Sequence, residues 1–273
     1  MATDSGILML HNKQLKVGKI PIIILPGIDT IMHAMAESMV KEIEENNEKG
    51  KLTLFIIPVG PVKQYPYFVQ LVNQKRLSLK RVTFINMDEY MESPAKLISK
   101  THPLSFRRFM EENCYKKIDA DLLMPESQRI FPSLENADLI EQVIANHGGV
   151  DICFGGIGIN GHIAFNEPPE EGEQISETDF MNLSVRVQKV SRETKVVNSI
   201  SDLDGAYDNI PDYCITVGFK QILAARKIHL YCFRNWQRSV IRKASFGERT
   251  VQFPVSLLQT HKNTFITIPQ ELA

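Results

Sequence analysis

Residues with the chemistry of a catalytic site are concentrated in one glycine-rich stretch in the second half of the chain. Glycines at positions 155, 156 and 158 are followed by Asn160, His162 and Glu167. Glycine permits a sharp turn and a close approach of the backbone to a ligand. Imidazole titrates near neutral pH, which suits it to general acid–base chemistry. Taken alone, such a turn is common, and a single histidine is more often structural than catalytic.

A second pair of candidate residues follows another apolar run. Asp88 and Glu89 come directly after the run at 82–87. Carboxylates beside a buried strand are costly unless they are paired or hydrogen-bonded. The alternative is that they are acids of a turn or of a helix N-terminus, which would make their role structural. Taken alone, the pair leaves both roles open.

Alternating strands and helices are expected to position these segments. Apolar runs bounded by glycine or proline predict strands at 20–25, 52–58, 82–87, 150–156, 213–218, 228–233 and 265–268, and an extended piece at 183–190. Helical spacing of apolar residues predicts helices from 30 to the 46–50 region, around 67–72, at 103–116, 134–147, 235–246 and 254–261, and a short one after 218. Residues 168–182 and 191–212 are expected to be loops.

This alternation predicts an α/β fold. We expect a single doubly wound, mostly parallel sheet with helices on both faces, similar to a Rossmann fold. No shift in composition marks a boundary, so residues 1–273 are expected to form one domain. Because ligands bind at the carboxyl ends of strands in such sheets, both candidate segments are expected at the site.

The bulk composition narrows the classes of partner. The chain has 273 residues, 43% of them hydrophobic, and a formal net charge of −1. Such a balance argues against nucleic acid or a membrane surface as a partner held by bulk electrostatics. We expect no signal peptide and no membrane span. The four cysteines are scattered without metal-site spacing, so we expect reduced thiols, no metal site and a cytoplasmic location.

The candidate segments resemble the signatures of one enzyme family. Residues 155–168 read Gly-Gly-Ile-Gly-Ile-Asn-Gly-His-Ile-Ala-Phe-Asn-Glu-Pro. This string resembles the glucosamine-6-phosphate deaminase (isomerase) signature Gly-x-Gly-x-Asp/Asn-Gly-His-x-x-x-Asn-Glu-Pro. The Asn-Met-Asp-Glu-Tyr string at 86–90 resembles the second motif of the family at a similar separation. The related 6-phosphogluconolactonases share the Gly-His part but lack the Asn-Glu-Pro ending.

The resemblance implies an activity and residue roles. Family members convert an amino-sugar phosphate into a keto-sugar phosphate and release ammonia, without a metal or an organic cofactor. Asp88 matches the proton-transfer base, His162 the ring-opening residue and Glu167 the acid that partners the histidine. We expect substrate-binding roles for four further residues: Thr30, Glu89, Asn160 and Gly161. The expected partner is an amino sugar or its phosphate, and the family often forms homo-oligomers.

The chain departs from the family pattern at the third member of the catalytic triad. Asn160 stands where the glucosamine enzymes have aspartate. An amide oxygen can accept a hydrogen bond from imidazole, but it cannot supply the charge that stabilises imidazolium. Sequences resembling galactosamine-6-phosphate deaminase/isomerases carry Asn-Gly-His, so this change is compatible with activity. Glu167 is left as the candidate charge partner.

The phosphate-binding positions depart further. Asp29 brings a negative charge beside Thr30, and Ile200 and Gln237 stand where the family has an arginine and a lysine. Three cations are candidates to replace them: Lys195, Arg234 and Arg238. The sequence therefore predicts that the substrate is not a standard hexosamine 6-phosphate or that its anionic group is held differently.

Three interpretations compete. The first is an amino-sugar phosphate deaminase or isomerase that uses Asp88, His162 and Glu167. The second is a catalytically impaired member that binds a sugar or sugar phosphate as a regulator, or a deaminase for an atypical or non-phosphorylated amino sugar. The third is a lactonase of the related branch, which the Asn-Glu-Pro ending at 166–168 disfavours. An ammonia-release assay on a panel of amino sugars separates them.

Overall fold

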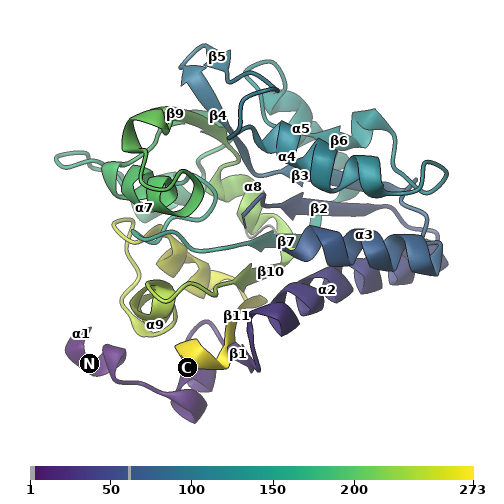
Figure 1. The fold of residues 1–273 in the computed structure, drawn as a ribbon. Coiled ribbons are helices and arrows are strands. Elements are labelled where there is room, and N and C mark those ends of the chain that lie inside the picture. The colour runs from purple at the N-terminus through teal and green to yellow at the C-terminus, as the bar shows by residue number, and fades with distance from the viewer. Residues whose placement is uncertain (1–3, 61–62) are drawn as a thin grey trace.

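A parallel seven-stranded sheet forms the centre of the molecule (Figure 1). The computed structural model describes residues 4–60 and 63–273. The strand order is β1-β11-β10-β7-β2-β3-β6, and every pairing in this sheet is parallel. The strands are β1 (Ile22–Leu25), β2 (Thr53–Ile57), β3 (Val82–Asn86), β6 (Arg129–Ile130), β7 (Val150–Gly155), β10 (Ala225–Tyr231) and β11 (Thr264–Pro269).

Helices cover both faces of this sheet. One layer contains α2 (Ile28–Glu48), α3 (Gln64–Lys75) and α4 (Phe106–Asn113). The other contains α5 (Ala137–His147), α8 (Phe219–Leu223) and α9 (Gln237–Phe246). Alternate residues of β2 enter the two cores, with Phe55 and Ile57 on the first side and Leu54 and Ile56 on the second. The predicted α/β fold with a doubly wound parallel sheet is confirmed.

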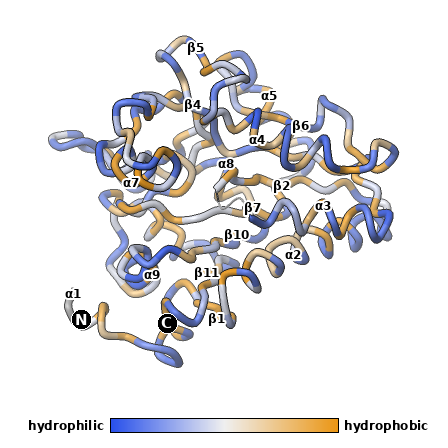
Figure 2. The backbone as a smooth tube through the Cα atoms, in the orientation of Figure 1, coloured by the Kyte–Doolittle hydropathy of each residue, from blue (hydrophilic) through white to orange (hydrophobic). Residues whose placement is uncertain are grey.

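The inner faces of the long helices explain their stability. Along α2, apolar residues recur at helical spacing and are buried against the sheet, whereas its other face is charged. Figure 2 shows this as alternating hydrophobic and hydrophilic colour along α2 and α3. The methionines Met32, Met35 and Met39 are fully buried and fill this core.

The strand order creates a crevice between β2 and β7. From β2 the chain continues to β3 and β6 on one side, and from β7 it continues to β10 and β11 on the other. The connections at the carboxyl ends of β2 and β7 therefore diverge. In open α/β sheets this topological switch point is where ligands bind.

A second, antiparallel sheet lies beside the crevice and was not predicted. It has the order β5-β4-β9-β8, with β4 (Asp88–Ser93), β5 (Lys96–Leu97), β8 (Arg186–Lys189) and β9 (Tyr213–Thr216). β4 continues directly from β3 after Met87. Asp88 therefore lies where the chain passes from the central sheet into the second sheet.

The prediction of a loop at 191–212 was wrong, because this segment contains α7 (Arg192–Asp202). Ser191 is its N-cap, and the Ser191 hydroxyl accepts a hydrogen bond from the Thr194 amide. Val196 and Ile200, two of its apolar residues, are exposed, so the helix lacks the apolar inner stripe that sequence patterns reveal. In Figure 1 this helix lies beside β4 and β9, over the carboxyl ends of the central strands.

Several shorter elements also differ from the predictions. Residues 254–261 form the 3₁₀ helix η5 (Pro254–Thr260) instead of an α-helix, and the helix predicted at 103–116 is divided into α4 and η2 (Tyr115–Lys117). The loop predicted at 168–182 contains α6 (Glu177–Met181). The remaining short helices are α1 (Asp4–Leu8), η1 (Asn12–Val17), η3 (Glu126–Gln128), η4 (Tyr207–Asn209) and η6 (Gln270–Leu272).

Two further expectations concern cysteines and membranes. Cys114, Cys153, Cys214 and Cys232 are all buried free thiols. Within residues 4–60 and 63–273, no helix combines the length and the apolar character needed to cross a membrane.

Asn166 connects the loop after β7 to the second sheet and gives the first testable prediction. Its buried amide donates to the carbonyls of Ile163 and Val217, both at 2.9 Å, and accepts from Arg186 Nη1 at 2.8 Å. We expect Asn166→Ala to lower the free energy of unfolding by about 2–4 kcal/mol, because it leaves buried polar groups unpaired. Denaturant titration measures this change.

The matched control is Asn182→Ala, whose exposed amide makes one bond within its own turn, to the Thr178 carbonyl. It is expected to cost less than about 0.5 kcal/mol. Equal losses in the two variants would contradict the connecting role of Asn166.

Candidate active site

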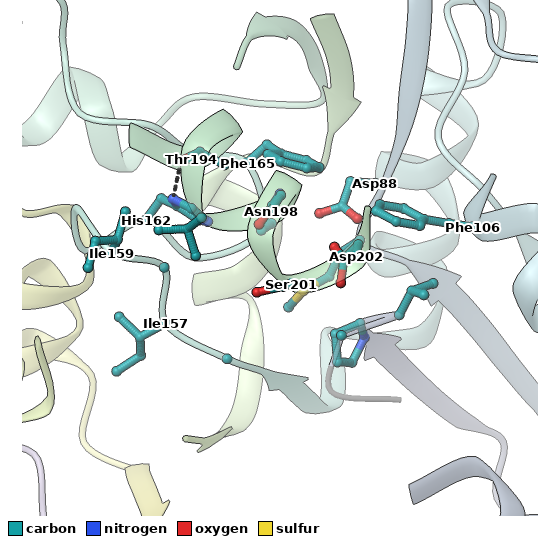
Figure 3. A pocket seen from close by; sticks show the side chains of 18 of the residues that line it. Asp88, Phe106, Ile157, Ile159, His162, Phe165, Thr194, Asn198, Ser201 and Asp202 are labelled. Carbon is teal, nitrogen blue, oxygen red and sulfur yellow. Dashed lines mark hydrogen bonds between the residues drawn. The ribbon is translucent and has the colours of Figure 1, made fainter. Parts of the chain in front are cut away.

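A cavity of about 460 Å³ opens at the switch point of the central sheet (Figure 3). Its walls come from the loops after β2, β7 and β10, the start of β4, residues 103–109 and the inner face of α7. The volume lies within the range typical of small-molecule sites. The cavity therefore occupies the position that the fold favours for a ligand.

Asp88 lies in the wall of this cavity. It is the first residue of β4, and its residue surface is 8% exposed. Burial, with a smaller contribution from the neighbouring charge of Glu89, raises the pKa of its carboxyl group to about 8. Within the described part of the chain, no side chain or amide donates a hydrogen bond to this carboxyl group. Asp88 thus has the environment of a group that exchanges protons near neutral pH.

His162 lines the same cavity, and its Nδ1 atom faces away toward polar partners. Nδ1 lies 2.8 Å from the Asn160 amide oxygen, 3.2 Å from the Thr194 hydroxyl and 3.3 Å from Oε2 of Glu167. Because the amide oxygen can only accept, Nδ1 is assigned as the protonated nitrogen. Nε2 is then the nitrogen available to a ligand, in the form that accepts a proton.

Glu167 supplies a buried charge behind the imidazole. Asn160 Nδ2 donates to Oε2 of Glu167 at 2.6 Å and to the Ser191 hydroxyl at 3.1 Å. Burial acts to raise the pKa of Glu167, but the charge of His162 and hydrogen bonds from His162, Asn160 and Thr194 outweigh it and lower the pKa to about 2. Asn160 therefore bridges an ionised carboxylate to the imidazole, and that carboxylate is itself close enough to stabilise imidazolium.

Two glycines of the turn after β7 provide the space and the backbone conformation that this position of His162 requires. A Cβ atom at Gly158 would lie 2.0–2.3 Å from atoms of the His162 ring. Gly161 has a φ of 82°, and a Cβ there would lie 2.5 Å from Phe253. The glycine at 158 therefore leaves room for the imidazole, and that at 161 allows the turn that precedes it.

Glu89 requires a correction, because the structure does not bring it to the cavity. Its fully buried carboxylate accepts hydrogen bonds from the Ser105 hydroxyl, the amides of Phe106 and Arg107, and Nε of Arg107, all at 2.9–3.0 Å. It caps the N-terminus of α4 and pairs with Arg107. The structural alternative for this acid, a helix N-terminus, is the one observed.

The other predicted substrate-binding residues also lie outside the cavity wall. Thr30 is exposed on the first turn of α2 and does not line the cavity. Asn160 and Gly161 lie behind His162, and the Gly161 carbonyl accepts from the Val255 amide at 2.8 Å. Of the residues predicted for the site, Asp88 and His162 line the cavity, whereas Glu167 acts from behind.

Sequence patterns missed the wall contributed by α7. Asn198, Ser201 and Asp202 line the cavity from this helix, and in the view of Figure 3 they lie between His162 and Asp88, with Asp202 next to Asp88. Asn198 Nδ2 donates to the Tyr90 hydroxyl at 2.9 Å, which joins α7 to β4. The Ser-Arg-Glu-Thr string at 191–194 has the form of a helix N-cap and was the available signal.

Fold and site together define an α/β protein with a cavity lined by Asp88 and His162 at the switch point of its sheet. No protein-family model matches the chain. A glucosamine-6-phosphate deaminase of Phocaeicola vulgatus is 30% identical over 218 residues, which cover 77% of this chain and 75% of that protein. A glucosamine-6-phosphate deaminase of Clostridium perfringens strain 13 is 26% identical, covering 92% and 98%. The chain belongs to the glucosamine-6-phosphate deaminase family.

Solved structures agree with the fold. A monomeric glucosamine-6-phosphate deaminase, described as a missing link of the NagB superfamily, matches with a TM-score of 0.77 at 24% identity, covering 92% of this chain and 98% of that one. A 6-phosphogluconolactonase from Trypanosoma cruzi matches with a TM-score of 0.64 at 17% identity, covering 92% and 95%. At these identities the matches establish the fold, which both kinds of enzyme share.

The buried Asp88 carboxyl group predicts a pH-dependent stability difference. Unfolded aspartate has a pKa of about 3.9, and that of folded Asp88 is about 8. Between these two pKa values, folded Asp88 keeps a proton that the unfolded chain has lost. The free energy of unfolding therefore has its full value below the unfolded pKa and decreases as the pH rises to and through the folded pKa. We expect Asp88→Asn to become more stable than the wild type by on the order of 5 kcal/mol at pH 8.

Denaturant titrations of both proteins between pH 4 and pH 8 measure this difference. The advantage of the variant should shrink as the pH falls toward 4. A difference that does not change with pH would contradict the desolvated environment of Asp88.

Proposed function

We propose that the protein is an amino-sugar phosphate deaminase/isomerase. Its substrate would be a 2-amino-2-deoxyaldose 6-phosphate of the glucosamine or galactosamine type, and its products a ketose phosphate and ammonia. The observation that carries the proposal is that Asp88 and His162 line one cavity while Glu167 charges the back of the imidazole. The names of the related proteins support the same substrate class.

Ring opening would be the task of His162. Nε2 accepts the proton of the C1 hydroxyl and returns a proton to the ring oxygen, so that the C1–O5 bond breaks and the open-chain aldehyde forms. The imidazolium present between these transfers is stabilised by the carboxylate of Glu167, 3.3 Å from Nδ1. The bond from Nδ1 to Asn160 keeps Nε2 directed at the ligand.

Proton transfer between carbons would be the task of Asp88. Its carboxylate removes the C2 proton of the open-chain aldehyde, whose amino group is an ammonium, and O1 takes up a proton from that ammonium to give an enolamine. Asp88 then delivers the C2 proton to C1, which leaves an iminium at C2. Water adds to this carbon, the C2–N bond of the resulting carbinolamine breaks, and ammonia leaves as the C2 carbonyl forms. A substrate ammonium near Asp88 favours the ionised carboxylate that the first step needs.

Two competing interpretations make different predictions. A regulator would bind the amino sugar without turnover, and the change at Asn160 motivated that interpretation. In the structure Asn160 joins His162 to an ionised Glu167, which supports an active enzyme. A lactonase would hydrolyse a sugar lactone and release no ammonia. An ammonia-release assay with glucosamine and galactosamine, each with and without the 6-phosphate, separates these functions.

Replacing the proposed base tests the mechanism. We expect Asp88→Asn to lower kcat/KM for ammonia release by about 10²–10⁴-fold, because an amide cannot accept the C2 proton. Asp208→Asn, on the exposed surface, is the matched control and should retain the wild-type rate. An unchanged rate in Asp88→Asn would remove this residue from the mechanism.

The pH profile gives an independent check of the same role. Because the base must be ionised, kcat/KM of the wild type should rise with pH and level off above about 8. A rate that falls over the same interval would contradict the assignment of Asp88 as the base.

A further inference from the structure

The cavity contains little positive charge for a phosphate-bearing substrate. Among the described residues that line it, Arg234 is the single lysine or arginine. Asp88 and Asp202 add carboxyl groups to the same wall. A phosphate group is held best by charged donors, so its position in this cavity depends on where Arg234 lies.

The other cations near this region are engaged elsewhere. Lys195 pairs with Asp212, and its ammonium lies 4.8 Å from the centre of the Tyr207 ring. Arg238 Nη2 lies 3.1 Å from Nδ1 of His11 and donates to the Ala273 carbonyl at 3.3 Å. Neither side chain lines the cavity. Of the three cations that could replace the missing family residues, Arg234 is the one placed to do so.

Gln237 positions the backbone that carries Arg234. Its amide oxygen accepts from the amides of Phe233 and Arg234, both at 2.9 Å, and its Nε2 donates to the Ile157 carbonyl at 2.8 Å. These bonds join the loop after β10 to the loop after β7. A glutamine at the position where the family resemblance predicts lysine therefore serves the backbone, and the cation stands three residues earlier.

Arg234 and Ser201 together form a set of donors at the mouth of the cavity. Nη1 of Arg234 donates to the Ser201 hydroxyl oxygen at 2.8 Å, and the guanidinium lies 5.7 Å from the centre of the Phe233 ring. A hydroxyl that accepts one bond can donate its own hydrogen to another acceptor, and a guanidinium carries five donors. Both residues belong to the cavity wall, so these donors can converge on one anionic group.

We propose that Arg234, together with the Ser201 hydroxyl, binds the anionic group of the substrate. Asp202, the next residue on α7, opposes this binding through its own negative charge in the same wall. The identity of the anion as a sugar phosphate rests on the proposed function. The anion site therefore lies between α7 and the loop after β10, away from Thr30 on α2.

Binding of glucitol 6-phosphate tests this assignment without requiring turnover, because this sugar alcohol has no carbonyl and no amine. Titration calorimetry compares it with glucitol for the wild type, Arg234→Gln and Arg238→Gln. We expect Arg234→Gln to weaken binding of the phosphate roughly tenfold or more, the size expected for a lost charge-assisted hydrogen bond. Arg238→Gln, which removes the same charge outside the cavity, should bind as the wild type does.

The third variant is Asp202→Asn, which should tighten binding several-fold by removing the opposing charge. Unchanged affinity in Arg234→Gln, or equal losses in Arg234→Gln and Arg238→Gln, would overturn the assignment. If the wild type releases no ammonia but Arg234→Gln still loses the ligand, the proposed deaminase function fails and the anion site stands. If ammonia release is intact and Arg234→Gln binds normally, the anion site fails and the function stands.

Discussion

The buried carboxylate of Glu167 is the constraint on which the site depends. A buried charge is costly unless it is hydrogen-bonded and paired, and here Asn160 and His162 meet both needs. The same contacts orient the imidazole, because its Nδ1 side is committed to Asn160 and Glu167. Asn160, which lies between the two ionisable groups, thus fixes the orientation of the imidazole, while the Glu167 carboxylate supplies the negative charge. The negative charge that an aspartate at 160 would carry lies instead on Glu167, 3.3 Å from Nδ1 of His162.

The carboxyl groups of Asp88 and Glu167 have opposite environments. Glu167 is surrounded by donors, and its pKa falls to about 2. Asp88 is buried at the junction of two sheets, where no group of residues 4–60 and 63–273 donates a hydrogen bond to its carboxyl group, and its pKa rises to about 8. Two carboxyl pKa values shifted in opposite directions are typical of sites in which one group stays ionised and the other transfers protons. Leaving Asp88 without donors costs stability, which is a common compromise at active sites.

Six of the seven strands of the central sheet and the residues of the β7 turn could be predicted from sequence because their signals are local, whereas the two-residue strand β6 could not. Buried strands produce short apolar runs, and the turn motif carries His162 and Glu167 on adjacent backbone. The wall formed by α7 could not be predicted, since its inner face is polar where it lines the cavity. Glu89 was misassigned because its partner, the N-terminus of α4, lies more than a dozen residues further along the chain. Such long-range capping leaves no periodic signal.

The tautomer of His162 is the most direct test of the account. ¹⁵N chemical shifts of the labelled imidazole at neutral to mildly alkaline pH distinguish a protonated Nδ1 from a protonated Nε2. The account predicts that neutral His162 carries its proton on Nδ1 in the wild type, and that Glu167→Gln weakens this preference. A neutral ring protonated on Nε2, with no response to Glu167→Gln, would contradict the central claim that the buried carboxylate and its amide bridge organise the site.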